Sequence, residues 1–197
     1  MTTLTIYMVR HAPVTGKQGV IYGDDADIDL ESTAARIYEL SGLLPSPEKS
    51  VWYHSGVDRA HRTARAVLSI MQKEQAQITS HDGFREQHFG SLIGCKHEDI
   101  TDHLRFIDGK IFAPAPPGGE TIPEFIARVE TAINDLKDKA QQEDKKNIVV
   151  FCHGGTIRAA HATIKGLDAE QFISLDTPPL FAYQSDIYRY GAYKIKT

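Results

Sequence analysis

Two short apolar segments, each leading into a histidine, constrain the fold of this chain more than any other sequence feature. Residues 4–9 (LTIYMV) and 147–152 (NIVVFC) consist largely of aliphatic and β-branched side chains, and His11 and His153 come shortly after them. Such runs are typical of strands that are buried on both faces of a parallel sheet. Functional side chains are therefore expected just past the carboxyl ends of these strands.

The remaining strand candidates carry a weaker signal. Residues 50–54 (SVWYH) and 77–79 (QIT) are short and partly β-branched, and residues 181–196 surround a turn signal at Gly191. We expect the first two segments to be strands and the last to be a terminal hairpin.

Apolar residues recur at helical spacing in two segments between these strands. The spacing predicts amphipathic helices over residues 57–71 and 125–140. Each has a start signal in which a hydroxyl side chain precedes an acidic residue by three positions, Ser55 before Asp58 and Thr121 before Glu124. We therefore expect both hydroxyl groups to cap the N-termini of helices.

Strands thus alternate with helices along the chain. This order predicts an α/β fold, a three-layer α/β/α sandwich with a mainly parallel sheet. With 197 residues, 41% of them hydrophobic and 24% charged, the composition is that of a globular protein and fits a single domain over residues 1–197. Residues 112–120 (FAPAPPGGE) are interpreted as a surface loop inside this domain, and residues 141–146 (QQEDKK) as a solvated helix end.

Charge and cysteine content argue against several classes of function. A formal net charge of −4 gives no global attraction to nucleic acid or anionic membranes, and no apolar run approaches the roughly 18 residues of a membrane span. The N-terminus lacks the basic stretch of a secretory leader, so a cytoplasmic location is expected. Cys95 and Cys152 are isolated and indicate neither a disulfide framework nor a zinc site.

Polar residues follow the two strongest strand segments. Arg10 and His11 come after the first, and His153, Gly154 and Gly155 separate the second from a helix. Two glycines let a backbone approach a ligand closely, and a helix N-terminus offers free amides and partial positive charge, which together suit a phosphate. Each pattern also has a purely structural interpretation, as a solvated strand end or a tight strand-to-helix turn.

Two further residues fit the same chemistry. Arg59 falls in the first turn of the helix predicted over residues 57–71, where a guanidinium can fork two hydrogen bonds to a phosphate. Glu86 stands in a loop-like stretch among aromatic residues, where a partly desolvated carboxyl would suit a general acid. An exposed arginine and a solvated loop glutamate are the alternatives.

The order of these segments resembles the histidine phosphatase superfamily, also called phosphoglycerate mutase-like. Five segments carry the resemblance: VRH at 9–11, SGVDRAHRTA at 55–64, REQHFG at 85–90, PPGGET at 116–121 and HGGTIR at 153–158. The resemblance implies that His11 is the nucleophile and Glu86 the proton donor, with His153 also catalytic. The phosphate pocket is then assigned to Arg10, Arg59, His153 and the backbone of Gly154.

The implied reaction is hydrolysis of a small-molecule phosphomonoester through a phosphohistidine, with inorganic phosphate as product. A phosphoryl group in transfer spreads negative charge over its oxygens, so the site needs fixed cations and amides. His11 attacks only as a neutral imidazole, and two neighbouring arginines disfavour its protonated form. Glu86 would protonate the departing alkoxide and then activate the hydrolytic water. No metal and no other cofactor is implied.

The chain departs from phosphoglycerate mutases after its first motif. Pro13 and Val14 stand where those enzymes have a Glu-Ser or Glu-Thr pair, and the asparagine that follows is missing, so the phosphate ligand usually supplied there is in doubt. Whether Thr15 or Lys17 replaces it is left open. Residues 94–116 also provide little chain to close over an intermediate, which favours release of phosphate over its retransfer.

The length of the chain and the pattern over residues 21–30 look most like the alpha-ribazole phosphatase and broad-specificity branch. Three alternatives stay open: a phosphoglycerate mutase-type phosphotransferase, a cysteine-dependent phosphatase and a non-catalytic phospholigand-binding protein. The second rests on the string from Cys152 to Arg158, a Cys-x5-Arg pattern typical of such enzymes. A metal site is a further candidate, built from His54, Asp58 and His61. Neither the substrate nor the oligomeric state follows from the sequence.

Overall fold

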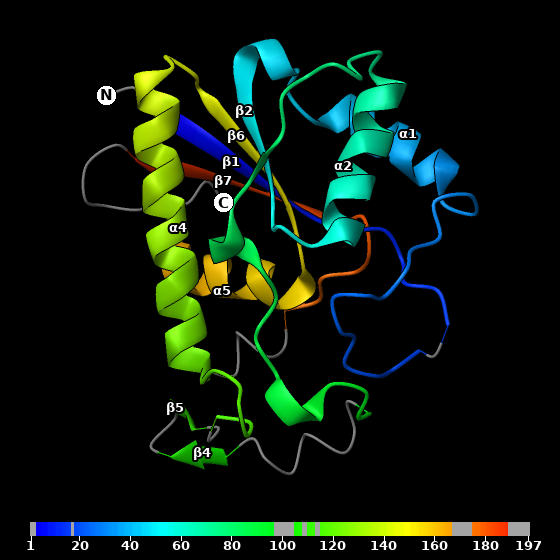
Figure 1. Cartoon of the computed structure of the whole chain (residues 1–197). Helices are drawn as coiled ribbons and strands as arrows, with labels where there is room; N and C mark the ends of the chain where they lie inside the picture. The colour runs from blue at the N-terminus through cyan, green and yellow to red at the C-terminus, as the bar shows by residue number, and fades with distance from the viewer. Residues whose placement is uncertain are drawn as a thin grey trace.

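A five-stranded, mostly parallel sheet forms the centre of the computed structural model, which describes residues 3–16, 18–96, 105–107, 110–112, 115–166 and 175–188 (Figure 1). The strand order is β3-β2-β6-β1-β7. These strands are β1 (Thr3–Arg10), β2 (Ser50–His54), β3 (Thr79–Ser80), β6 (Asn147–Cys152) and β7 (Ala182–Tyr188). β3, β2, β6 and β1 run parallel, and β7 is antiparallel to β1.

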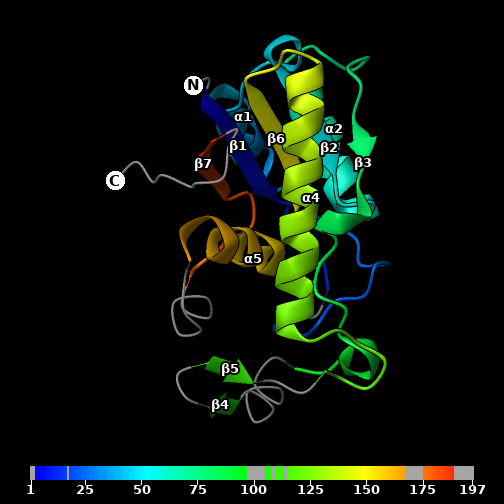
Figure 2. The same cartoon turned by 90° about the vertical axis from the view of Figure 1, so that its left-hand side faces the viewer.

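Helices cover both faces of this sheet. They are α1 (Ala34–Leu43), α2 (Asp58–Ile70), α4 (Ile122–Gln142) and α5 (Gly154–Lys165). Three short 3-10 helices are η1 (Pro47–Lys49), η2 (Asp82–Phe84) and η3 (Gly90–Leu92). α4 and α5 lie on one face of the sheet and α1 and α2 on the other (Figures 1 and 2). The predicted three-layer α/β/α sandwich is confirmed.

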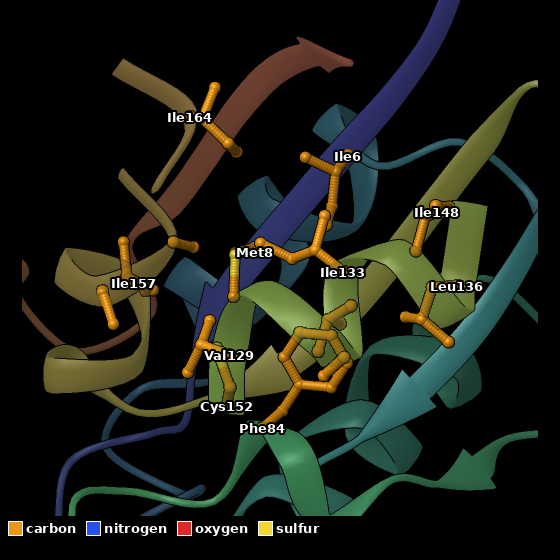
Figure 3. Close-up of a cluster of buried hydrophobic side chains, with 14 of the residues drawn as sticks. Ile6, Met8, Phe84, Val129, Ile133, Leu136, Ile148, Cys152, Ile157 and Ile164 are labelled. Atoms are coloured by element: carbon orange, nitrogen blue, oxygen red, sulfur yellow. The ribbon is translucent and has the colours of Figure 1, made fainter. Parts of the chain in front are cut away.

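Side chains of the central strand β6 alternate between two hydrophobic cores. Ile148, Val150 and Cys152 pack with α4 and α5 (Figure 3), whereas Val149 and Phe151 pack with α1 and α2. All five are fully buried, and complete burial of a large aliphatic side chain stabilises a fold by about 1.5–3 kcal/mol. The prediction of a strand buried on both faces is confirmed, and this double packing fixes the carboxyl end of the strand.

The weaker strand predictions are confirmed only in part. Residues 50–54 form β2, but the next strand, β3, is two residues long and begins at Thr79. Because β3 is an exposed edge strand that pairs with only the last two residues of β2, no buried face specifies its length. β7 covers the first part of the segment predicted to be a terminal hairpin, but residues 189–196, with the expected turn at Gly191, lie outside the described residues, so the hairpin stays a prediction.

One of the two predicted helix caps is correct. The Glu124 N–H donates to Thr121 Oγ1 at 3.2 Å and the Thr121 N–H donates to Glu124 Oε2 at 2.8 Å, which makes a capping box at the start of α4. The prediction for Ser55 is wrong, since α2 begins at Asp58 with Val57 at its N-cap and no side-chain cap bond. Ser55 is instead fully buried at the edge of the sheet, where its hydroxyl meets another partner.

An antiparallel pair of short strands, β4 (Arg105–Ile107) and β5 (Lys110–Phe112), is not predicted by the sequence. It lies away from the central sheet, below the start of α4 in Figure 1. The predicted surface loop over residues 112–120 overlaps this pair only at Phe112, the last residue of β5. α4 ends exposed at Gln142, as predicted. No helix within the described ranges is long and apolar enough to cross a membrane.

Candidate active site

The carboxyl ends of three parallel strands bring two histidines and a serine to one edge of the sheet. His11 follows β1, Ser55 follows β2 and His153 follows β6. The ring centroids of His11 and His153 are 5.2 Å apart, and the rings cross at 63°. Both side chains are buried, with 4% and 0% of their surface exposed. The fold thus brings together the two histidines that follow the predicted strands.

A chain of hydrogen bonds fixes the ring of His11. Its Nδ1 donates to the Ala12 carbonyl at 2.6 Å, which assigns the lone pair to Nε2. The Ala12 N–H donates to Thr63 Oγ1 at 3.0 Å, and the Thr63 hydroxyl donates to the Arg59 carbonyl at 2.7 Å. These bonds tie His11 to the first turns of α2.

The surroundings of His11 keep it neutral. Its pKa falls from 6.5 to about 3, chiefly through burial, then through the charge of Arg59 and, least, that of Arg10. The bond to the Ala12 carbonyl acts in the opposite direction. At neutral pH the imidazole is therefore neutral and has a free lone pair on Nε2, as the predicted mechanism requires of its nucleophile.

His153 is held neutral as well, with one ring nitrogen unpaired. Burial, His11 and Arg59 keep its pKa well below the usual range. The Ser55 hydroxyl lies 2.8 Å from His153 Nε2, and its oxygen accepts from the Val57 N–H at 3.5 Å. In the tautomer in which this hydroxyl donates to Nε2, the ring proton is on Nδ1, which is buried and has no hydrogen-bond partner among the described residues. That tautomer presents a donor to a ligand.

Arg10 and Arg59 lie near both histidines, and each guanidinium is only partly paired. Arg10 Nη1 donates to the Thr177 carbonyl at 2.5 Å, and Arg59 Nη1 donates to the Gly23 carbonyl at 2.8 Å. The Nε–H of each arginine is buried without a hydrogen-bond partner in the described part of the chain. Because buried donors are nearly always paired, these groups indicate a site for an anion.

Glu86 meets the N-terminus of α5. The Gly155 N–H donates to Glu86 Oε2 at 3.1 Å. A methyl group on Gly155 would overlap Glu86 Oε1, so glycine lets the carboxyl group keep this position. Gly154 opens α5, and its N–H is among the amides that a helix leaves unpaired at its start. At Gly155 the close approach expected of the Gly-Gly pair is thus made by the carboxyl group of Glu86, a side chain of the protein itself.

Two helices anchor the loop that carries Glu86. Thr156 Oγ1, from α5, donates to the Arg85 carbonyl at 3.1 Å. Arg128, from α4, donates to the carbonyls of Gly83, Arg85 and Glu86 at 2.9, 3.2 and 3.3 Å. The alternative of a merely solvated loop glutamate is therefore wrong, because this loop is held against both helices.

A cavity of about 680 Å³ borders the histidine site through Arg59 and Glu86. The apolar part of its wall comes from Tyr22, Phe89, Ile93 and Ala132. Most of the other side chains in this wall are polar or charged, so the cavity suits a polar small molecule.

Two arginines in the wall of this cavity are already paired with carboxylates. Arg85 pairs with Asp24, and Arg128 pairs with Glu120 at an N–O distance of 2.5 Å. Their charges are therefore compensated within the protein, unlike those of the arginines beside the histidines.

Cys152 does not belong to the site. Its side chain lies in the hydrophobic core with Met8 and Val129 (Figure 3), and burial raises the pKa of its thiol. Arg158, the other end of the Cys-x5-Arg string, donates to the Leu175 carbonyl at 2.8 Å. A thiol buried among apolar groups is inert, so the hypothesis of a cysteine-dependent phosphatase is wrong.

The histidines of the proposed metal site are engaged in other bonds. His54 Nδ1 accepts from the Gly56 N–H at 3.1 Å, and His61 Nε2 accepts from Arg65 Nε at 3.2 Å. Within the described ranges, no three His, Cys, Asp or Glu side chains are placed to share a metal ion. The hypothesis of a metal site that includes His54 and His61 is therefore wrong.

Sequence analysis missed three polar residues of the site: Ser55 as a partner of His153, Thr63 and Thr177. Ser55 directly follows a predicted strand, so its place at the carboxyl edge could have been recognised. Thr63 and Thr177 reach the site only through the folding of distant segments, and no local pattern marks them. Thr15 is exposed and Lys17 lies outside the described residues, so the structure assigns neither to the pocket.

Fold and site together define an α/β sandwich with paired histidines and arginines at the carboxyl ends of its central strands. The chain belongs to the histidine phosphatase superfamily, branch 1, whose family profile matches residues 6–193. The members of this family are phosphatases and mutases.

Curated relatives and solved structures agree with this assignment. A 2,3-bisphosphoglycerate-dependent phosphoglycerate mutase 2 from Gloeobacter violaceus is 26% identical and covers 92% of this chain and 86% of its own length. The structure of phosphoglycerate mutase from Bacillus anthracis matches with a TM-score of 0.76 and 19% identity over 100% of this chain and 92% of that one. The alpha-ribazole phosphatase from Shigella flexneri matches with a TM-score of 0.75 and 20% identity over 98% and 95%. At these identities the solved structures establish a shared fold.

Proposed function

We propose that the protein hydrolyses phosphomonoesters through a phosphohistidine formed on His11. One observation carries the proposal: four buried polar atoms near a neutral histidine have no hydrogen-bond partner among the described residues. They are Arg10 Nε, Arg59 Nε, His153 Nδ1 and Thr177 Oγ1. Convergent cations and donors suit a phosphoryl group, because its negative charge is spread over several oxygens during transfer.

In the first step, Nε2 of His11 attacks phosphorus and the ester P–O bond breaks. The free Nε–H groups of Arg10 and Arg59 stabilise the charge on the phosphoryl oxygens. Glu86 enters this step protonated and gives its proton to the oxygen of the leaving alcohol. The products are the free alcohol, a phosphohistidine and a Glu86 carboxylate.

In the second step, the Glu86 carboxylate takes a proton from a water molecule that attacks phosphorus. The P–N bond to His11 breaks, inorganic phosphate leaves and Glu86 is again protonated. The position of Glu86 supports both roles, because its anchored loop holds it between α5 and the cavity. The groups named are side chains and backbone amides, so the reaction needs no metal ion.

The cavity supports a leaving alcohol that carries no negative charge. Two of its arginines, Arg85 and Arg128, are compensated by Asp24 and Glu120, and the third, Arg59, is assigned to the phosphoryl group. No arginine of the described wall is then left for a second acidic group. An alpha-ribazole phosphate, whose alcohol is a nucleoside without a carboxylate, fits this wall. We propose esters of this uncharged class, alpha-ribazole phosphate among them, as substrates.

A phosphoglycerate mutase-type phosphotransferase is the second candidate, because the curated relatives carry that name. A mutase returns the phosphoryl group to a second hydroxyl of its substrate, whereas a hydrolase gives it to water. The compensated arginines favour the hydrolase, since a glycerate leaving group brings a carboxylate into the cavity.

Release of inorganic phosphate from p-nitrophenyl phosphate, alpha-ribazole phosphate and 3-phosphoglycerate tests the proposal, with conversion of 3-phosphoglycerate to its isomer followed in parallel. We expect hydrolysis of the first two esters, unaffected by excess chelator and abolished in His11→Ala. Isomerisation without phosphate release would show a mutase. Activity lost on chelation and restored by Mg²⁺ or Zn²⁺ would overturn the mechanism, as would full activity in His11→Ala.

A further inference from the structure

Thr177 carries a buried hydroxyl that is not explained by the packing of the fold. The residue lies in the segment before β7 and exposes 1% of its surface, yet its Oγ1 has no hydrogen-bond partner among the described residues. A threonine hydroxyl can donate one hydrogen bond and accept two. Leaving such a group unpaired in the interior is costly, so its retention points to a role in the bound state.

The hydroxyl lies at the point where the anion site is built. A methyl group on Gly154 would be 2.9 Å from Thr177 Oγ1 and 3.5 Å from both Cζ and Nε of Arg10. The Thr177 hydroxyl, the unpaired Nε–H of Arg10 and the first residue of α5 therefore surround one small space. The Thr177 carbonyl also accepts from Arg10 Nη1 at 2.5 Å, so the residue orients that guanidinium.

The backbone that follows Thr177 is fixed against the end of β1. The Phe181 N–H donates to the Pro178 carbonyl at 3.0 Å, and the Leu180 N–H donates to the Arg10 carbonyl at 3.2 Å. The Arg10 N–H donates in return to the Phe181 carbonyl at 2.9 Å. A donor on such a segment is preorganised and loses little entropy when a ligand binds.

We propose that the Thr177 hydroxyl donates a hydrogen bond to the phosphoryl group held between Arg10 and the N-terminus of α5. This role rests on the proposed phosphate pocket and adds a ligand to it. The sequence leaves open which residue replaces the phosphate ligand that is absent after the first motif, where Pro13 and Val14 stand and Thr15 is exposed. Thr177, close to the C-terminal strand β7, would supply that ligand.

The hydroxyl is tested by two substitutions that separate it from the rest of the side chain. Thr177→Val removes the hydroxyl and keeps the shape, whereas Thr177→Ser keeps the hydroxyl and removes the methyl group. Binding of inorganic phosphate and of vanadate is measured by calorimetry, together with the melting temperature of the free protein.

We expect Thr177→Val to weaken phosphate and vanadate binding about 10- to 100-fold, the range for a hydrogen bond to a charged group, and Thr177→Ser to stay within about threefold of the wild type. The melting temperature of free Thr177→Val should be equal to or higher than that of the wild type, because an unpaired buried hydroxyl is removed. If Thr177 only stabilised the fold, Thr177→Val would lower the melting temperature.

Each outcome bears on the proposal. Equal affinity of the wild type and Thr177→Val would overturn it, and so would equal losses in Thr177→Val and Thr177→Ser, since the methyl group would then be responsible. A wild type that binds phosphate without hydrolysing any ester would overturn the proposed function alone, and the same affinity order would still establish Thr177 as a ligand. A wild type that binds neither anion would overturn both.

Discussion

Two pairs of arginines serve this site in opposite ways. Arg10 and Arg59 lie beside the histidines, donate to backbone carbonyls and keep a buried Nε–H without a partner among the described residues. Arg85 and Arg128 line the adjoining cavity and pair with the carboxylates of Asp24 and Glu120. The difference supports the proposed substrate class: the first pair has donors left for a phosphoryl group, whereas the second pair is already neutralised by carboxylates of the protein.

Burial of Arg10 and Arg59 has a cost in free energy. Burial lowers the pKa of both Arg10 and Arg59, although a guanidinium remains charged. Glu86 is the leading carboxylate that acts in the other direction on each of them. A buried charge without a close partner destabilises the free protein, so binding of an anion should stabilise it.

The largest effect should follow from removing one of the open arginines. Arg59→Gln is expected to lower kcat/KM about 10³- to 10⁵-fold, because a fixed arginine stabilises the charge on the transferring phosphoryl group. Arg62→Gln is the matched control, since Arg62 lies one turn along α2, is partly exposed and pairs with Asp27. Steady-state hydrolysis of p-nitrophenyl phosphate gives kcat/KM for both variants. Similar losses in Arg59→Gln and Arg62→Gln would show that Arg59 has no special role at the phosphoryl group.

Glu86 stands where the two regions meet, and its effect should depend on the leaving group. An alkyl ester releases a basic alkoxide that needs the proton, whereas p-nitrophenolate leaves with little assistance. Glu86→Gln should therefore slow phosphoenzyme formation from an alkyl ester about 10²- to 10⁴-fold and from p-nitrophenyl phosphate far less. Rapid-quench rates of this step avoid the later attack of water, which is common to both esters. Equal losses would exclude Glu86 as the acid.

Burial of His11, together with the charges of Arg59 and Arg10, predicts a pH dependence of stability. The pKa of His11 is about 3 in the folded protein and about 6.5 when unfolded, so the unfolded chain takes up the proton first as the pH falls. His11 should therefore reduce the free energy of unfolding as the pH falls from 6.5 toward 3, by about 1 kcal/mol between pH 6.5 and 5.5.

Denaturant unfolding of the wild type and His11→Asn at both pH values measures this contribution. His11→Asn should lose less stability than the wild type between pH 6.5 and 5.5. An identical decrease in the two proteins would mean that His11 titrates alike in the folded and unfolded states.

The smallest effect should come from removing the charge of Asp24, the carboxylate that pairs with Arg85. Among the described residues, Asp24→Asn leaves Arg85 with only the longer ion pair to Asp82, at 3.8 Å. We expect the ratio of activities on 3-phosphoglycerate and glycerol 3-phosphate to rise about two- to fivefold, as suits a partly exposed ion pair. Asp138→Asn, an exposed position on α4, is the matched control and should leave the ratio unchanged. A ratio unchanged in Asp24→Asn would show that the cavity does not select by charge.

The sequence predicted the parts of this molecule that depend on local pattern. The runs before His11 and His153 alternate between two cores, and this double burial makes their strands recognisable. Arg59 and Glu86 carry weak local signals, and the order of their segments in the family gave them a role. That residues 1–197 form a single domain stays a prediction.

Other features depend on contacts that no local pattern records. Ser55 matches a helix-cap pattern in the sequence, but in the fold its buried hydroxyl forms a hydrogen bond with His153. Cys152 matches the Cys-x5-Arg pattern of cysteine-dependent phosphatases, but the alternation of side chains along β6 points it into the hydrophobic core. Thr177 is separated from Arg10 by 167 positions, so only the folded chain brings it to the anion site.

The most direct test of the account is to trap the phosphoenzyme. The protein is mixed with a ³²P-labelled alkyl phosphate, quenched within milliseconds and divided between acid and alkali. Because a phosphoramidate is labile in acid and stable in alkali, the account predicts label that survives only in alkali, maps to the peptide containing His11 and is absent from His11→Ala. Label that is lost in alkali, or that persists in His11→Ala, would contradict it.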